Sequence, residues 1–153
     1  MGICGIDEAG RGPWAGPVVA AAVVLPPRGR PKGLTDSKQL NAAARAELAQ
    51  AIRACAMVGV GVASVDEIDA LNILRATHLA MERALMALPI APAAALIDGN
   101  SAPPSLPCPA ETIIDGDAHV GSISAASIIA KVTRDAMMSE LCMRYPGYAF
   151  AKP

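Results

Sequence analysis

Acidic residues stand where several apolar segments of the sequence end, and their carboxylates are the groups best suited to chemistry. Asp7 and Glu8 close the first apolar segment, Asp98 closes the fourth, and Asp117 comes just after the fifth. If these segments are strands of an open α/β sheet, their ends border the crevice in which ligands commonly bind. The pattern therefore predicts that these carboxylates cluster at one site.

A cluster of carboxylates needs cations, because like charges repel strongly where the dielectric constant is low. Mg²⁺ and Mn²⁺ prefer oxygen ligands and leave coordination positions open for water and substrate phosphate. Two such ions about 4 Å apart activate a water and stabilise the leaving oxygen in phosphodiester cleavage. For each carboxylate taken alone, ordinary turn chemistry remains the alternative, since Asp before Gly is common in turns.

Asp7 and Glu8 pose a geometric problem, because adjacent residues of a regular strand point to opposite faces of the sheet. A shared site for both side chains predicts a bend in the strand, which the following Ala9-Gly10 permits. The glycines here do not form a nucleotide-binding motif. Arg11-Gly12 replaces the Lys-Ser/Thr of a P-loop, and the interval from Gly12 to Gly16 is one residue too long for a dinucleotide fingerprint.

The elements that must position these residues follow from apolar periodicity, which predicts an α/β fold. The expected strands are Gly2 to Asp7, Val18 to Leu25, Met57 to Ala63, Ala94 to Ile97 and Thr112 to Ile114, and the expected helices are Asn41 to Cys55, Ser64 to about Leu88 and Gly121 to Met143. Capping oxygens at Thr35-Asp36-Ser37 and the Ser64 to Glu67 capping box mark helix starts. The first three strands are close enough in sequence to pair antiparallel.

Composition limits the class of protein. The 153 residues, 53% apolar, predict a single domain, 1–153, with a well-filled core. The longest apolar run, Val18 to Leu25, is too short to span a bilayer, so no membrane association is expected. There is no secretion signal, and the isolated cysteines fit small buried residues in a reducing cytoplasm. The net charge of −1 does not by itself favour a nucleic-acid partner.

The sequence closely resembles bacterial ribonuclease HII, the type 2 ribonuclease H family. The segments that carry the resemblance are 5–13, 15–22, 36–40, 67–69, 72–74, 96–100, 116–117 and 124–135, followed by 145–148 and 150–152. The match runs in order along the whole chain. It implies a ribonuclease H-like mixed sheet flanked by helices, with its first three strands antiparallel.

The resemblance implies a metal-dependent endonuclease that hydrolyses the RNA strand of RNA/DNA hybrids. It also implies nicking on the 5′ side of single ribonucleotides in duplex DNA, with 3′-hydroxyl and 5′-phosphate products and a place in ribonucleotide excision during DNA replication and repair. The family's catalytic carboxylates fall on Asp7, Glu8, Asp98 and Asp117. Asp7, Glu8 and Asp98 correspond to the principal Mn²⁺ or Mg²⁺ ligands, and Asp117 completes the acidic cluster.

The resemblance also implies substrate-binding residues. Gly10-Arg11-Gly12 resembles the loop that reads the ribose 2′-hydroxyl, the atom that distinguishes RNA from DNA. Lys38 is expected to contact phosphate, with a merely solvated lysine as the alternative. His78 is expected to pack or bond locally, His119 at most to tune the site, and Asp135 to form an ion pair or lie on the surface.

Two departures from the family pattern affect the expected activity. Asp115 replaces a common Lys before Gly116-Asp117, which adds negative potential beside the site. The family continues beyond Phe150-Ala151-Lys152 with a basic segment that holds its sugar-stacking Tyr, whereas Pro153 follows here, and Tyr148 lies too early for that role. A C-terminally shortened chain is therefore expected, and the loss of that segment accounts for the near-neutral charge.

Two other functions remain open. One is an inactive fragment that keeps the fold and the metal-binding carboxylates, and the other is a small-molecule phosphohydrolase or metal-binding α/β module. The favoured interpretation is a cytoplasmic, monomeric ribonuclease that acts on RNA/DNA hybrids.

Overall fold

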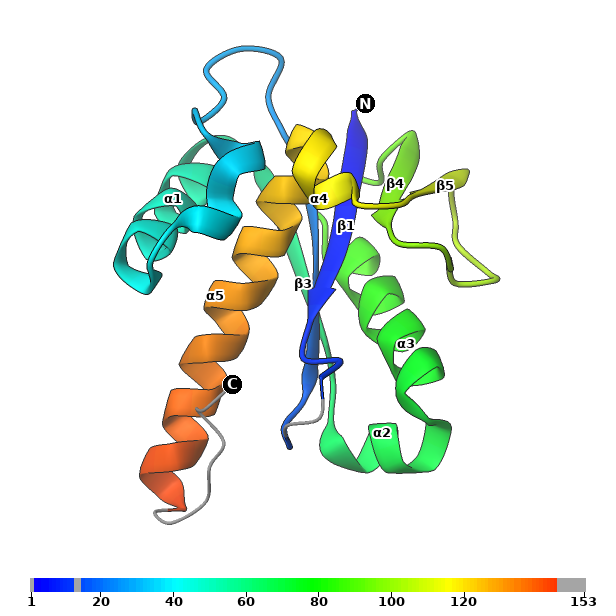
Figure 1. The fold of residues 1–153 in the computed structure, drawn as a ribbon. Coiled ribbons are helices and arrows are strands. Elements are labelled where there is room, and N and C mark those ends of the chain that lie inside the picture. Colours follow the sequence, from blue (N-terminus) through cyan, green and yellow to red (C-terminus); the bar gives the residue numbers. More distant parts are fainter. Residues whose placement is uncertain (1, 13–14, 146–153) are drawn as a thin grey trace.

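A mixed five-stranded sheet lies between two layers of helices in the computed structural model, which describes residues 2–12 and 15–145 (Figure 1). The strands are β1 (Ile3–Ala9), β2 (Val18–Val24), β3 (Met57–Ala63), β4 (Ala94–Asp98) and β5 (Ala110–Ile113). The helices are the 3₁₀ helix η1 (Leu34–Gln39), α1 (Ala42–Cys55), α2 (Val65–Leu71), α3 (Ile73–Met86), α4 (Gly116–His119) and α5 (Gly121–Arg144).

The strand order is β3-β2-β1-β4-β5. β1 pairs antiparallel with β2, and β2 pairs antiparallel with β3. On the other side of β1 the direction changes, because β4 pairs parallel with β1 and β5 pairs parallel with β4. The predicted α/β class and mixed sheet, with the first three strands antiparallel, are confirmed.

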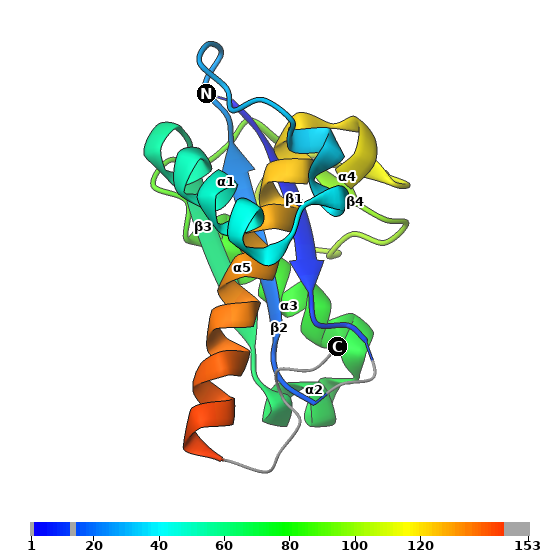
Figure 2. The same cartoon turned by 60° about the vertical axis from the view of Figure 1, so that its left-hand side comes forward.

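Two apolar layers hold the helices on the sheet. α1 and α5 cover one face, where Ile52 and Ile129 share a buried core with residues of β2. α3 covers the other face, where Ala80 and Met81 share a buried core with residues of β1 and β2 (Figures 1 and 2). Every residue of β2 is buried, since this strand is covered on both faces. Its Val-Val-Ala-Ala-Ala-Val-Val sequence fits that position, because small and branched side chains pack well there.

Gly5 allows α5 to lie unusually close to β1. A Cβ placed on Gly5 would collide with the backbone of Ser122 and Ile123 at the start of α5. The odd-numbered residues of β1 therefore face α5, while Cys4 and Ile6 enter the core beneath α3. This alternation decides where the acidic side chains of β1 can point.

Several expected boundaries are corrected by the structure. The helix expected from Ser64 to about Leu88 is two helices, because Asn72 adopts a left-handed φ of 74° and its side chain caps the start of α3. The Ser64 capping box is confirmed. Residues 35–37 do not cap α1; they lie within η1, and the Asn41 side chain caps α1 instead.

Strand ends shift by a few residues, as polar strand termini give weak boundary signals. β1 extends through Ala9 rather than ending at Asp7, and β5 begins at Ala110 rather than Thr112. None of the helices in the described ranges is long and apolar enough to cross a membrane. Tyr148 and Pro153, which figured in the expected C-terminal departure, lie outside the described residues.

Candidate active site

Asp7 and Asp98 lie side by side because of the register between β1 and β4. Ile6 is opposite Ile97 in this parallel pair, and both side chains are buried in the core beneath α3. The next residue on each strand, Asp7 or Asp98, therefore points to the face covered by α5. The strand pairing alone brings two of the predicted carboxylates together at the end of the sheet.

Asp117 reaches the same place from α4. Its backbone N–H donates a hydrogen bond of 3.2 Å to Oδ1 of Asp98. The hydroxyl of Ser124 on α5 donates to the carbonyl oxygen of Asp117 and to that of Val120 at 3.1 Å, which fixes α4 against α5. Gly116 permits this packing, since a Cβ there would meet Ile123 at 2.6 Å.

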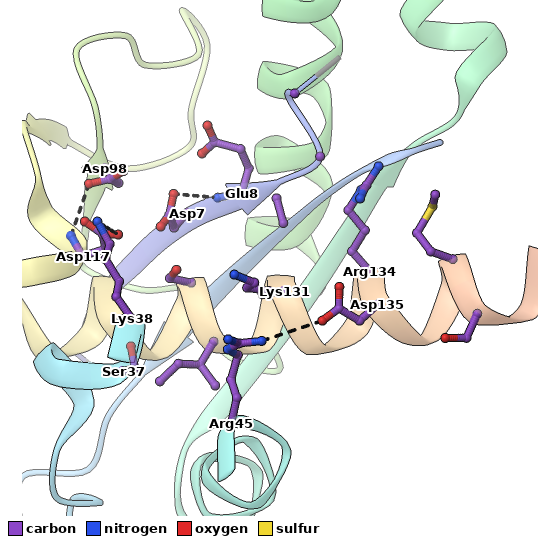
Figure 3. A pocket seen from close by; sticks show the side chains of 17 residues that line it. Asp7, Glu8, Ser37, Lys38, Arg45, Asp98, Asp117, Lys131, Arg134 and Asp135 are labelled. Atoms are coloured by element: carbon purple, nitrogen blue, oxygen red, sulfur yellow. Dashed lines mark hydrogen bonds and ion pairs between the residues drawn. The ribbon is translucent and has the colours of Figure 1, made fainter. Parts of the chain in front are cut away.

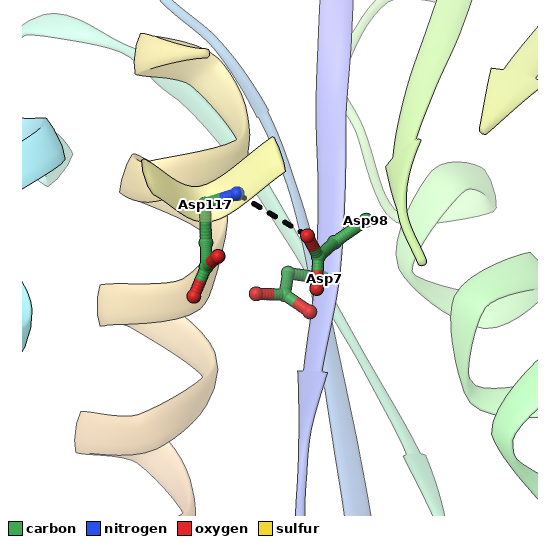
Figure 4. A group of neighbouring side chains, drawn as sticks. All are labelled: Asp7, Asp98 and Asp117. Carbon is green, nitrogen blue, oxygen red and sulfur yellow. Dashed lines mark hydrogen bonds between the residues drawn. The ribbon is translucent and has the colours of Figure 1, made fainter. Parts of the chain in front are cut away.

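The result is a compact group of three carboxylates (Figure 4). Among the described residues, one carboxylate oxygen from each of Asp7, Asp98 and Asp117 lies within 4.8 Å of the other two. Asp7 is only 5% exposed, whereas the other two are half-buried. The strand-end pattern in the sequence thus identified residues that the fold brings into one site.

The electrostatics of this group match a cation site. Burial, followed by the charges of Glu8 and Asp98, raises the pKa of Asp7 from 3.8 to about 9. A carboxyl group in this position resists ionisation until positive charge is supplied nearby. Converging carboxylate oxygens are the donor set that hard divalent cations such as Mn²⁺ and Mg²⁺ prefer. The residues present therefore fit a divalent metal.

Glu8 is placed differently from Asp7. β1 does not bend between them, because both residues remain in register with β2, opposite Ala20 and Ala21. The expected bend is wrong, and the two side chains leave the strand in different directions (Figure 3). Oε1 of Glu8 lies 3.5 Å from the Arg11 guanidinium, and Oε2 is buried without a hydrogen-bond partner among the described residues. Glu8 lines the same cavity, and its role as a metal ligand stays a prediction.

Lys38 lies at the acidic cluster, not in bulk solvent away from it. Its Nζ is 3.0 Å from Oδ2 of Asp117, while its side chain is 67% exposed. The hydrogen bond to Asp117 and the charge of that carboxylate raise the pKa of Lys38. Asp115 precedes α4 in a left-handed conformation (φ 55°), and its charge adds to the negative potential at Lys38.

A cavity of about 860 Å³ extends from the carboxylates along α5 (Figure 3). Gly10 and Gly12 line it, together with Lys38, whereas Arg11 is not among the lining residues. In the described part of the chain, three further cationic side chains line the cavity, namely Arg45, Lys131 and Arg134. An acidic end that can hold cations therefore continues into a groove that can hold an anionic chain.

The basic residues of the groove were missed by the sequence interpretation. Lys131 and Arg134 are three residues apart and so lie on one face of α5. This spacing was the available signal, but it marks the groove only once α5 is known to border the acidic cluster. The expectation for Asp135 is confirmed, since it lies 3.9 Å from Arg45. His78 is locally bonded as expected, 3.0 Å from the Ser101 hydroxyl.

Comparison with known proteins shows which family the chain belongs to. The family model described as Ribonuclease HII matches residues 4–153. The chain belongs to the ribonuclease HII family. Ribonuclease HII of Parvibaculum lavamentivorans is 60% identical over 150 residues, which cover 98% of this chain and 56% of that protein. The chain thus spans little more than half the length of this curated relative.

Two solved ribonuclease structures have a fold similar to that of this chain. The crystal structure of the ribonuclease H2 from Pyrococcus horikoshii OT3 covers 100% of this chain, and the chain covers 81% of it, with a TM-score of 0.85 and 28% identity. Bst-RNase HIII, in a crystal structure in complex with Mn²⁺, covers 94% of this chain, and the chain covers 55% of it, with a TM-score of 0.80 and 25% identity. The sheet and its flanking helices are therefore ribonuclease H-like.

Proposed function

We propose that this chain is an endonuclease that hydrolyses the RNA strand of RNA/DNA hybrids. The proposal includes nicking on the 5′ side of single ribonucleotides in duplex DNA, with 3′-hydroxyl and 5′-phosphate ends. The observation that carries it is the convergence of Asp7, Asp98 and Asp117 in a chain of the ribonuclease HII family. Membership of this family supports a nucleic-acid substrate over a small-molecule phosphate ester.

Asp7, Glu8, Asp98 and Asp117 are the proposed catalytic carboxylates. Asp7 and Asp98 would hold a divalent metal from the sheet, with Glu8 as a further ligand, and Asp117 would complete the cluster from α4. When bound, two Mn²⁺ or Mg²⁺ ions supply Lewis-acid chemistry, which activates water and neutralises charge on the phosphodiester. The Mn²⁺ complex of Bst-RNase HIII and the oxygen-only donor set support the metal requirement.

The substrate-binding residues are proposed to surround this cluster. Gly10, Arg11 and Gly12 would approach the ribose, where a chain without side chains at two positions lets backbone groups reach the 2′-hydroxyl. Lys38 would exchange its contact with Asp117 for a substrate phosphate, because its exposed ammonium group can pivot away from the carboxylate. Lys131 and Arg134 extend the positive potential along the groove.

A cleavage assay tests the proposed function. The chain is incubated with Mn²⁺ and a DNA duplex that contains one ribonucleotide, beside an Asp7→Asn variant and an all-deoxy duplex. The expected result is a single nick on the 5′ side of the ribonucleotide, lost in Asp7→Asn and absent from the all-deoxy duplex. Metal binding without a nick at high enzyme concentration would instead support a metal-binding domain without catalysis. Failure to bind hybrid at all would reject a nucleic-acid substrate.

A further inference from the structure

Arg134 joins the middle of α5 to the segment that follows β1. Its Nε–H donates a hydrogen bond of 2.9 Å to the carbonyl oxygen of Pro17, across 117 positions of sequence. The contact is partly buried, and Arg134 also lines the cavity that holds the carboxylates. One side chain therefore connects the helix that borders the groove to the residues that lead into β2.

Two glycines make room for this guanidinium. A Cβ on Gly10 would collide with Nε of Arg134 and would lie 2.6 Å from the Pro17 carbonyl oxygen. A Cβ on Gly16 would lie 3.0 Å from a terminal nitrogen of Arg134 and 2.6 Å from the Met138 sulfur. Both glycines also have φ values, 102° and 135°, that other residues rarely adopt. The backbone conformation and the limited space beside Arg134 thus both favour glycine at these two positions.

The hydrogen bond between Arg134 and Pro17 lies next to the backbone that borders the active site. Gly10 is three positions from Asp7, and Gly10 and Gly12 line the cavity beside the carboxylates. A displacement of this backbone by about 1 Å is enough to impair a reaction that depends on substrate placement. A side chain that fixes residues 10–12 relative to α5 also fixes them relative to Asp117, because α4 and α5 are bonded to each other.

We propose that Arg134 is a positioning residue that holds Gly10-Arg11-Gly12 in place for ribose recognition through its hydrogen bond to Pro17. This inference rests on the proposed function, in which residues 10–12 contact the ribose. It differs from a simple phosphate-binding role, in which only the positive charge of Arg134 matters. Lys131 provides the comparison, because it is a cation of the same groove on the same helix face.

Two substitutions at this position separate the hydrogen bond from the charge. In Arg134→Gln, the amide nitrogen occupies the place of Nε and keeps a donor for Pro17, whereas Arg134→Met places a methyl group there. Both variants lose the positive charge. Lys131→Met removes a charge from the groove without touching the Pro17 contact, so it serves as the matched control.

Amide hydrogen exchange in the metal-free protein measures the positioning directly. Arg134→Met should speed exchange in segments 10–12 and 15–17 by about tenfold, the usual effect of losing a hydrogen bond to a charged group. Arg134→Gln and Lys131→Met should stay within about threefold of wild type, since the donor to Pro17 is present in both. Equal exchange in the Gln and Met variants would overturn the proposal. Should Arg134→Met fail to fold, Gly16→Ala tests the same contact, because its Cβ would crowd the Arg134 guanidinium. This variant should also speed exchange at residues 10–12.

Cleavage of the single-ribonucleotide duplex supplies the functional readout. Arg134→Met should lower kcat by about tenfold with Mn²⁺ affinity unchanged, and Arg134→Gln should restore most of that loss. Lys131→Met should raise KM instead. Equal kcat in the Gln and Met variants would show that charge alone matters and would reject positioning. A wild-type chain that does not cleave would reject the proposed function, while the exchange comparison would still decide whether Arg134 holds the loop.

Discussion

The pKa of the buried Asp7 carboxyl group is strongly raised, and this makes the stability of the protein depend on pH. Its pKa is raised to about 9 by burial and then by Glu8 and Asp98. Between about pH 4 and pH 9 the folded chain therefore keeps a proton that the unfolded chain has released, so the free energy of unfolding falls as pH rises through this window. With EDTA present, urea unfolding of the wild type should show this decline.

Asp7→Asn should largely remove the decline, because the amide does not titrate. At pH 8 the metal-free variant should be more stable than wild type by at least about 1 kcal/mol, although it should bind Mn²⁺ weakly. Asp69→Asn, at an exposed position of α2, is the matched control and should follow wild type. A wild-type stability that increases from pH 5 to pH 8 in EDTA would contradict the electrostatic account of Asp7.

Lys38 competes with a cation for Asp117. Its ammonium group lies 3.0 Å from Oδ2 and contributes positive potential to the cluster. Lys38→Met should therefore tighten Mn²⁺ binding about two- to fivefold at low salt, an effect that solvent exposure and added salt both reduce. Titration calorimetry on Lys38→Met and on Lys32→Met, an exposed lysine that does not line the cavity, measures the difference. Weaker Mn²⁺ binding in Lys38→Met would show that Lys38 supports the metal site instead.

The contact between β1 and α5 sets the geometry of the carboxylate cluster. Gly5 is two positions before Asp7 in β1, and it lies against the backbone of Ser122 and Ile123. Gly5→Ala should force α5 away from the sheet, destabilise the protein by about 1 to 3 kcal/mol and weaken Mn²⁺ binding, because Asp117 moves with α4 and α5. Urea unfolding and calorimetry check both effects. Gly12→Ala is a control for stability, since a Cβ there meets no atom of the described residues within 4 Å, and it should unfold like wild type.

Periodicity in the sequence identified the elements well but said little about how their side chains meet. Asp7, Asp98 and Asp117 could be grouped because apolar strands end where ligand-binding crevices form. The break at Asn72 was missed, because the apolar pattern continues from α2 into α3 and a left-handed residue leaves no trace in that pattern. The direction of the Glu8 side chain follows from β1 continuing past Asp7 to Ala9, which the sequence pattern did not show. The contact between Arg134 and Pro17 joins distant parts of the sequence and depends on tertiary structure. Pairings of this kind are set by packing rather than by local preference.

The overall charge of −1 conceals an uneven distribution of charge around the cavity. The carboxylates of the cluster occupy one end of the cavity, which Asp135 also lines farther along α5. The cations that line the cavity are Lys38, Arg45, Lys131 and Arg134. Two of these, Lys38 and Arg45, are already within ion-pair distance of Asp117 and Asp135. A nucleic acid that binds in this groove thus meets few uncompensated positive charges in the described part of the chain.

Binding of a hybrid duplex should therefore depend only moderately on salt. Each phosphate that a cation neutralises contributes about −0.9 to the slope of log K against log salt, so two to four contacts give a slope of roughly −2 to −4. Fluorescence anisotropy in Ca²⁺ or EDTA between 50 and 200 mM salt, that is over about a fourfold range, measures this slope. Lys131→Met should make it shallower by about one. A slope near −8 would place most phosphate contacts outside this groove, because its cations are too few to release that many counterions.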